Sequence, residues 1–181
     1  MEGDNFSNQS PGDLEGLRKL LGEYDAMVYQ AVKEGRTAGL SGESHIFAKV
    51  IQEHLEFPHV HNALEFSDVR DGHPYMVGGV SPVAHLKMHA AVEEMIEGGN
   101  SDVKTTFEKL LVTGTGRHHA IHIIGALFLK YYVDAATAVQ SGESPEKAER
   151  TFKRSLKKIS TDASFRKKMT QTVDERHGFG D

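Results

Sequence analysis

The amino-acid sequence predicts an all-α protein, a multi-helix bundle of about six or seven helices. Apolar residues recur at steps of three and four along most of the 181 residues, which is the period of a helix with one buried face. Glycine, proline or N-capping residues separate these stretches, as expected where helices begin and end. The sequence contains no long alternation of polar and apolar residues, no internal repeat and no sustained heptad. Helices packed on one another are therefore the expected architecture.

The chain begins with a predicted disordered arm. Residues 1–12 are polar and end in a Pro-Gly pair, which favours neither a helix nor a strand. The helical pattern starts at Asp13, so we expect a single helical domain over residues 13–175. The first helix of this domain should end at the glycine-containing segment 35–39.

The next segment predicts one helix and one irregular stretch. A second helix should run from about Glu43 to Phe57, with Pro58 ending it. Residues 58–80 contain two prolines and a Gly-Gly pair, so we expect irregular structure there, with room for a short helix or strand near His61–Phe66.

Five further helices are predicted from their start and stop signals. Ser81 can cap a third helix that Pro82 opens and that Gly98-Gly99 ends. The last four helices follow the same logic and are expected from near Ser101 to Gly114, over 117–139, from near Ser144 and over 163–173. Leu111 in the fourth helix is among the residues expected to face the core. Residues 144–175 form a basic helical C-terminal part of an otherwise acidic chain.

Composition narrows the class of protein. The chain is 38% hydrophobic and 26% charged, with a net charge of -5, which favours a soluble globular domain and disfavours nucleic acid as a partner. Cysteine is absent, which excludes disulfides and thiolate metal ligands. The first residues lack the pattern of a signal peptide, and the longest apolar run, Ala120–Leu129, is too short to span a membrane. We therefore expect a cytoplasmic protein with no membrane association.

Histidines lie on the apolar faces of three predicted helices. Successive helical residues are about 100° apart, which places His85 and His89 within the same arc of about 60° as Val92 and Ile96. His54 lies in the middle of the apolar arc of the second helix. The second histidine pair lies on the face of the fifth helix that is expected to be buried. The residues of that face are His118, His122, Gly125, Leu129, Tyr132 and Ala136.

Burying several imidazoles favours a bound metal ion. Each buried ring nitrogen without a partner costs about 1–3 kcal/mol, and a divalent ion provides one partner for several rings at once. Side chains at i and i+4 on a helix are close enough to bind the same ion. Glu93 continues the series His85-x-x-x-His89-x-x-x-Glu93 and could add a ligand or accept a hydrogen bond from one. The predicted metal ligands are His54, His85, His89, Glu93, His118 and His122, with His59, His61 and His119 as secondary candidates.

The middle of the chain resembles a bacterial domain family of unknown function. Members of that family contain an Asn-Pro-x-x-His-x-x-x-His segment and, some 25–30 residues later, Arg-His-x-x-x-His at the start of another helix. The matching segments here are 81–89, where serine replaces the asparagine, and 117–122, and the resemblance covers about residues 53–130. The resemblance implies the histidine pattern and no reaction, because no activity is assigned to the family. By analogy alone, inward histidines from several helices are similar to those of hemerythrin-type and DinB-type metal-binding bundles.

Two functions are compatible with these observations. The first is a metal-binding bundle that holds zinc, iron or nickel, either as a binding protein or as a metalloenzyme with a small-molecule substrate. The second is a non-enzymatic helical interaction module whose core histidines are structural and whose basic C-terminal part contacts a partner. Either could form a homo-oligomer. The sequence does not decide between them, and metal content would.

Overall fold

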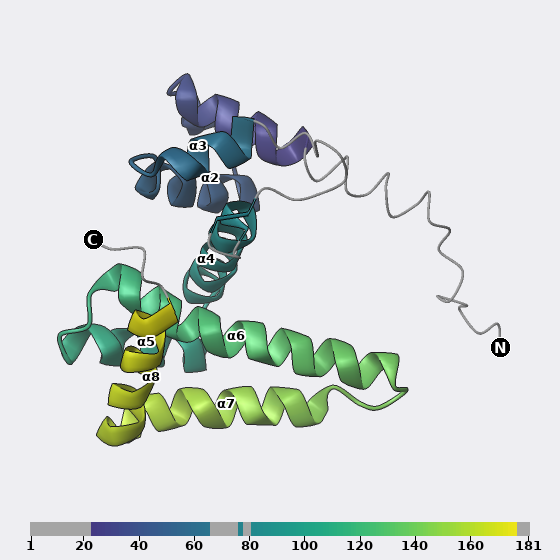
Figure 1. Cartoon of the computed structure of the whole chain (residues 1–181), viewed down its shortest axis with the longest axis vertical. Coiled ribbons are helices and arrows are strands. Elements are labelled where there is room, and N and C mark those ends of the chain that lie inside the picture. Colours follow the sequence, from purple (N-terminus) through teal and green to yellow (C-terminus); the bar gives the residue numbers. More distant parts are fainter. Residues whose placement is uncertain (1–22, 66–75, 78–80, 177–181) are drawn as a thin grey trace. The chain divides into compact units, whose positions relative to one another are not determined.

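The structure is a computed structural model that describes residues 23–65, 76–77 and 81–176, and its elements in those ranges are all helices (Figure 1). The all-α prediction is therefore confirmed for this part of the chain. The predicted arm over residues 1–12 lies outside the described residues, as does the start of the first helix. The described elements are a helix over residues 23–33, a 3-10 helix at Thr37–Gly39, α2 (Glu43–Glu53), α3 (Pro58–Glu65), α4 (Pro82–Glu97), α5 (Ser101–Val112), α6 (Arg117–Gln140), α7 (Glu146–Thr161) and α8 (Ala163–Arg176).

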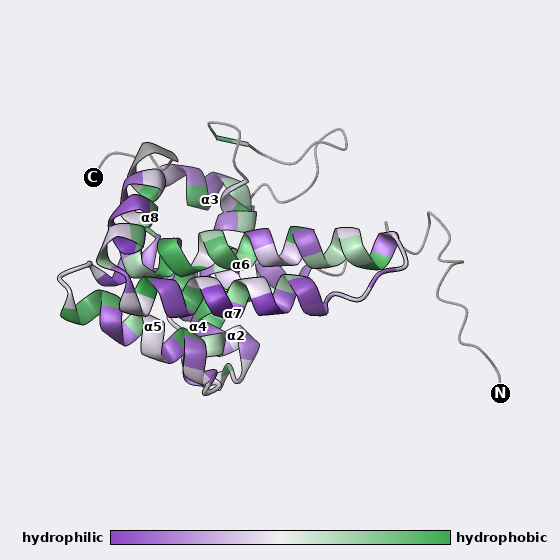
Figure 2. Cartoon of the chain, turned by 90° about the horizontal axis from the view of Figure 1, so that it is seen from below, coloured by the Kyte–Doolittle hydropathy of each residue, from purple (hydrophilic) through white to green (hydrophobic). Residues whose placement is uncertain are grey.

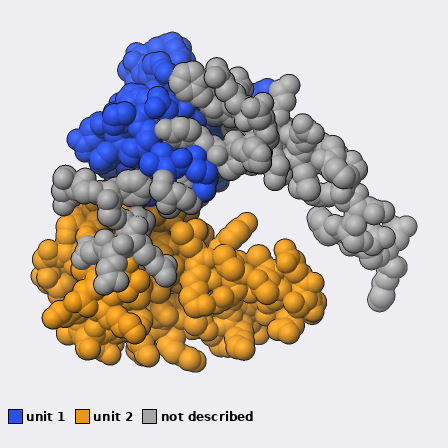
Figure 3. All heavy atoms as spheres, in the orientation of Figure 1, with its two compact units in different colours: residues 1–86 blue, residues 87–181 orange. Residues whose placement is uncertain are grey.

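The chain divides into two compact units, residues 1–86 and residues 87–181, where the sequence predicts one domain over residues 13–175 (Figure 3). The division falls inside α4, which is one continuous helix. Residues 82–86 of α4 therefore belong to the first unit, and residues 87–97 belong to the second. Each unit is described by itself below.

The first unit packs the helix over residues 23–33 against α2 and α3. Its buried side chains come from all three helices and include Val28, Val32, Phe47, Ile51, Val60 and Leu64. Polar contacts join the same helices: the Tyr24 and Ser44 hydroxyls are 2.8 Å apart, and Lys33 forms an ion pair with Glu65. Burial of these apolar side chains is the main stabilising contribution, and the polar contacts select their register.

The break between α2 and α3 differs from the expected one. The predicted second helix runs on to Phe57, whereas α2 ends at Glu53 with His54 as its C-terminal capping residue. Pro58 opens α3 instead of only ending the preceding helix, because a proline ring suits the first turn, where no amide hydrogen is needed. Of the short helix or strand predicted near His61–Phe66, the structure contains a helix, α3, which begins earlier, at Pro58. Most of the predicted irregular segment after it lies outside the described residues.

The second unit is built on α5, α6, α7 and α8, and the buried face of α7 joins the other three helices. Its residues alternate between strongly polar and apolar with helical period, so that Figure 2 shows bands of both colours along it. Its buried residues are Ala148, Phe152, Leu156 and Ile159, as the sequence predicts. This apolar stripe packs against α5 and α6, and α8 covers the remaining side. Thr106 of α5 is buried in the same contact and lies 3.3 Å from the Leu156 carbonyl oxygen, to which its hydroxyl donates.

The predicted helix starts carry the expected caps. The Ser81 hydroxyl accepts a hydrogen bond from the amide of Ala84 at 3.3 Å, and the Asn100 side chain accepts one from Val103 at 3.2 Å. Gly99 separates α4 from α5 with a φ of 81°, a left-handed conformation that glycine adopts without strain. The Ser81 cap sets where α4 begins, and the Asn100 cap sets where α5 begins.

Two predictions about core faces are wrong. Leu111 is 39% exposed, and on α6 Leu129 and Tyr132 are 49% and 64% exposed. The histidine-containing face of α6 is buried only in its first turns, at His122 and Gly125, where α4 packs against it. The second half of α6 packs against α7 through a different face, which carries Leu127 and the partly buried Tyr131. A helix of 24 residues is longer than the neighbours that cover it, so one face need not stay buried along its whole length.

None of the helices in the described ranges is long and apolar enough to cross a membrane.

The packing of α7 predicts a contrast between two leucines. Leu156→Ala should lower the free energy of unfolding by about 2–5 kcal/mol, because this fully buried side chain would leave a cavity. Leu129→Ala removes the same atoms from an exposed position of α6 and should change it by less than about 0.5 kcal/mol. Urea unfolding of both variants measures this, and equal losses would show that the core face of α6 has been assigned wrongly.

Candidate metal centre

His54 lies at the C-terminal end of α2, buried and with a defined tautomer. Its Nδ1 is 2.7 Å from the carbonyl oxygen of Val50. A carbonyl can only accept, so Nδ1 carries the hydrogen and Nε2 carries the lone pair of the neutral ring. Burial lowers the pKa of His54 below its ordinary value of 6.5, and the hydrogen bond to Val50 opposes this shift. A ring held neutral, with one nitrogen fixed by a backbone carbonyl, is the usual state of a metal-binding histidine.

His85 is in ring contact with His54. The two ring centroids are 5.5 Å apart and the rings are nearly perpendicular, at 76°. His85 is half-buried in the first turn of α4, whose start is set by the Ser81 cap. One helical turn further along the same helix lies His89, which is fully buried. The spacing that the sequence shows between His85 and His89 therefore places both on one side of α4.

His89 is in ring contact with two histidines of α6. Its centroid is 4.8 Å from that of His118 and 4.7 Å from that of His122, and the two α6 rings are 4.4 Å apart. The three rings thus form a compact triangle within the second unit, which we call the α4–α6 histidine triad. His122 is buried, whereas His118 is exposed at its outer edge. The sequence predicts that His118 faces the core, but its side chain is exposed. It lies in the first turn of α6, where side chains lean towards the N-terminal end of the helix.

A glycine brings α4 and α6 close enough for this triad. A Cβ atom added at Gly125 would lie 1.9 Å from the sulfur of Met88, which is far inside contact distance. Met88 immediately precedes His89, and Gly125 follows His122 by one turn on α6. The missing side chain therefore allows α4 to approach α6 at the level of the rings.

An ion pair joins the same two helices beside the triad. Arg117 Nη2 lies 2.5 Å from Glu93 Oε1, and Glu93 is only 2% exposed. Arg117 also lies over the ring of Phe107, with its guanidinium carbon 5.8 Å from the centroid. Glu93, which the sequence suggests as a metal ligand, thus contacts the residue that directly precedes His118. In the sequence, Arg117 stands out only as the first residue of the Arg-His-x-x-x-His segment, and no local pattern predicts its ion pair with Glu93.

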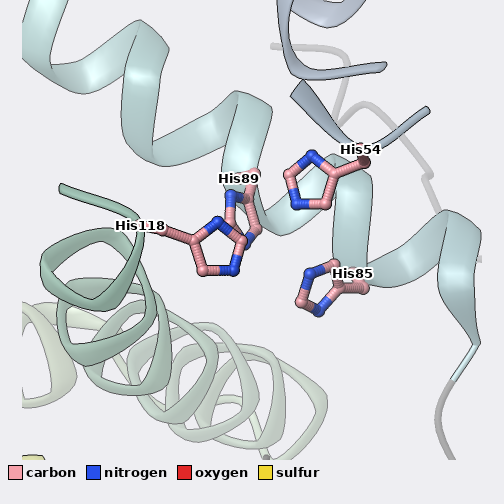
Figure 4. Close-up of side chains that lie close together, drawn as sticks. All are labelled: His54, His85, His89 and His118. Atoms are coloured by element: carbon pink, nitrogen blue, oxygen red, sulfur yellow. The ribbon is translucent and has the colours of Figure 1, made fainter. Parts of the chain in front are cut away.

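Four of the predicted ligands could hold a metal ion through one ring nitrogen each, namely His54, His85, His89 and His118. Figure 4 shows their origins: His85 and His89 project from α4, His54 from the end of α2 and His118 from the start of α6. Two of the four are fully buried, one is half-buried and one is exposed. A set of imidazoles without thiolates suits zinc, iron, nickel or copper, and the burial favours the neutral rings that metals need.

The secondary candidates lie elsewhere or in other contacts. Both nitrogens of His61 are engaged: Nε2 donates to the Leu55 carbonyl at 2.7 Å, and Nδ1 accepts from the Tyr29 hydroxyl at 2.6 Å. That histidine therefore joins helices within the first unit. His59 stacks near Phe57, with ring centroids 5.7 Å apart, and His119 lies half-buried in the first turn of α6. None of the three belongs to the group of four.

Comparisons with known proteins do not assign this chain to a family. A scan against family models, a search of curated proteins and a search of solved structures each returned no match to this chain.

The Glu93–Arg117 pair predicts an asymmetric response to substitution. Arg117→Ala should lower the free energy of unfolding at pH 7 by about 1–3 kcal/mol, because it leaves a buried carboxylate without its cation. The double variant Arg117→Ala/Glu93→Gln should recover part of that loss, since no uncompensated charge remains. Lys147→Ala, at an exposed position of α7, is the control. A loss for Arg117→Ala no larger than that of the control would contradict the pairing.

The lowered pKa of His54 predicts that the metal-free protein loses stability in acid. The unfolded chain binds a proton near pH 6.5, whereas the folded chain resists binding it until a lower pH. The free energy of unfolding should therefore begin to fall as the pH drops through 6.5 and stop falling below the folded pKa. This histidine contributes a slope of at most about 1.4 kcal/mol per pH unit. Urea unfolding between pH 8 and pH 5 measures the slope, which should be smaller in His54→Gln; an unchanged slope would show that His54 does not cause it.

Proposed function

We propose that this protein binds a divalent transition metal ion, zinc, iron or nickel, through His54, His85, His89 and His118. The observation that carries the proposal is the continuity of ring contacts along α4. Each of the two histidines on that helix is in contact with a histidine from another helix, His85 with His54 and His89 with His118. Neutral imidazoles brought together in this way can act as ligands of one shared ion.

The chemistry of the donors supports a transition metal over a harder ion. Calcium and magnesium prefer oxygen ligands, whereas neutral imidazole suits zinc, iron and nickel. The carbonyl of Val50 fixes the His54 ring, so that Nε2 carries the lone pair of the neutral imidazole. The only carboxylate among the predicted ligands, that of Glu93, is engaged by Arg117. The donors in the proposed site are therefore nitrogens.

The exposure of His118 is compatible with a metalloenzyme, because a substrate could reach an ion bound beside it. A metal with an incomplete set of protein ligands can bind a small molecule or activate water, and His118 is the most exposed member of the set. We also propose kinship with the bacterial family that shares the two helical histidine pairs, and this rests on those pairs alone.

The interaction module remains the alternative. Its support is the exposed basic face of α7, which carries Lys147, Arg154 and Lys157. Two other cations of this helix form i,i+4 ion pairs, Arg150 with Glu146 and Lys153 with Glu149. Such pairs are typical of a solvated helix surface, so they favour no particular partner.

The proposal predicts near-stoichiometric metal in the purified protein. The full chain, made without a histidine tag, should retain about one ion per chain after exposure to zinc, ferrous iron or nickel and removal of excess ion. Elemental analysis measures the content. A chelator should then lower the melting temperature, since the bound ion stabilises only the folded state. Less than about one ion per five chains with all three metals would overturn the proposal.

A matched pair of variants locates the ion. His89→Ala should weaken metal binding by at least about 10–100-fold. Loss of a residue that only orients a ligand has an effect of this size, and loss of a ligand itself should have at least as large an effect. His45→Ala changes an exposed histidine of α2 outside the group and should leave the affinity unchanged. Calorimetric titration with the metal alone compares them, and equal affinities would remove His89 from the site.

A further inference from the structure

We propose that His89, His118 and His122 form a facial three-histidine cap for an ion with right-angled ligand directions, such as ferrous iron or nickel, in preference to tetrahedral zinc. This inference rests on the proposed function and deepens it in two ways. It adds His122 to the ligands, and it narrows the class of metal. All three residues belong to the second unit, so the argument uses the geometry of that unit alone.

The separations of the three rings carry the inference. An imidazole nitrogen lies about 2.1 Å from a bound ion and the ring centre about 1.2 Å beyond it, so the ring centre lies about 3.2–3.3 Å from the ion. Two rings at a right angle would then have centres about 4.6 Å apart, and two rings at the tetrahedral angle about 5.3 Å apart.

The observed separations match the right angle. The three centroid distances are 4.4, 4.7 and 4.8 Å, and each is closer to the first value than to the second. His54 and His85, by contrast, have centroids 5.5 Å apart, wider than a right angle requires. The triad therefore has the spacing of three ligands on one face of a six-coordinate or square-pyramidal ion.

The helices that carry the triad make this spacing difficult to change. His118 and His122 are one turn apart on α6, so their separation is set by the helix itself. The approach of His89 is limited by the contact of Met88 with Gly125 on one side and tied by the Glu93–Arg117 pair on the other. Opening all three angles to the tetrahedral value would require α4 to move away from α6, which the Glu93–Arg117 pair opposes.

A facial cap leaves half of the coordination sphere for other ligands. His85, one turn before His89 on α4, is the nearest further imidazole along that helix. Any position that the protein does not fill is available to water or to a small exogenous ligand. This arrangement suits metals that accept five or six ligands.

The test uses cobalt as a spectroscopic probe on the full chain. Co²⁺ in a tetrahedral site absorbs visible light much more strongly than Co²⁺ with five or six ligands, so the spectrum reports the geometry directly. We expect weak visible bands for the wild type, and X-ray absorption of the nickel-loaded protein should show at least three imidazoles among five or six ligands. Nickel should bind more tightly than zinc.

His122→Ala and His122→Asn test the added ligand. Each should weaken nickel binding by at least about tenfold and reduce the preference of the protein for nickel over zinc, while His45→Ala should change neither. Thermal melts of the metal-free variants establish that they fold, and the wild-type spectra stand even if they do not. Intense tetrahedral cobalt bands, or nickel binding unchanged by both His122 variants, would overturn this inference and leave the proposed function standing. Failure of every metal to bind would overturn the proposed function itself.

Discussion

The close approach of α4 to the first turns of α6 is the constraint on which the histidine arrangement depends. Gly125 permits it, because any side chain there would occupy the space of the Met88 sulfur. Glu93 and Arg117 hold it, because a carboxylate buried to this degree needs a cation within reach. His89 lies between these two contacts in the sequence of α4, and its ring meets those of His118 and His122.

The apolar core of the second unit extends well beyond its polar site. It includes the fully buried Leu110, Leu156 and Ile159 on α5 and α7, and also Val92 on α4 and Ile123 on α6, beside the histidines. Apolar burial of this kind stabilises the fold whether or not an ion is bound. The imidazoles and the Glu93–Arg117 pair cost desolvation energy instead. The unit can carry that cost because the site occupies only one end of the packed surface of α6.

Hydrogen bonding distinguishes His61 from the candidate ligand His54. His61 uses both ring nitrogens in joining helices, to Tyr29 and to the Leu55 carbonyl, and so has no donor atom left for a metal. His54 uses Nδ1 on the Val50 carbonyl, which fixes the ring and leaves Nε2 as its donor. The two residues lie only seven positions apart. Their roles differ because one caps the end of α2 and the other faces the neighbouring helix over residues 23–33.

The sequence by itself determined the helices and the candidate ligands. Local signals are sufficient for this: Ser81 and Asn100 cap helices within three residues, and the i,i+4 spacing of His85 and His89 is a property of one helix. Only the tertiary structure decided which faces are covered. It exposes Leu129 and Tyr132 because α6 extends past α4, and it makes Pro58 the start of α3. It also pairs Glu93 with Arg117 and separates His61 from the candidate ligands, since these contacts join residues far apart in the chain and no local period encodes them.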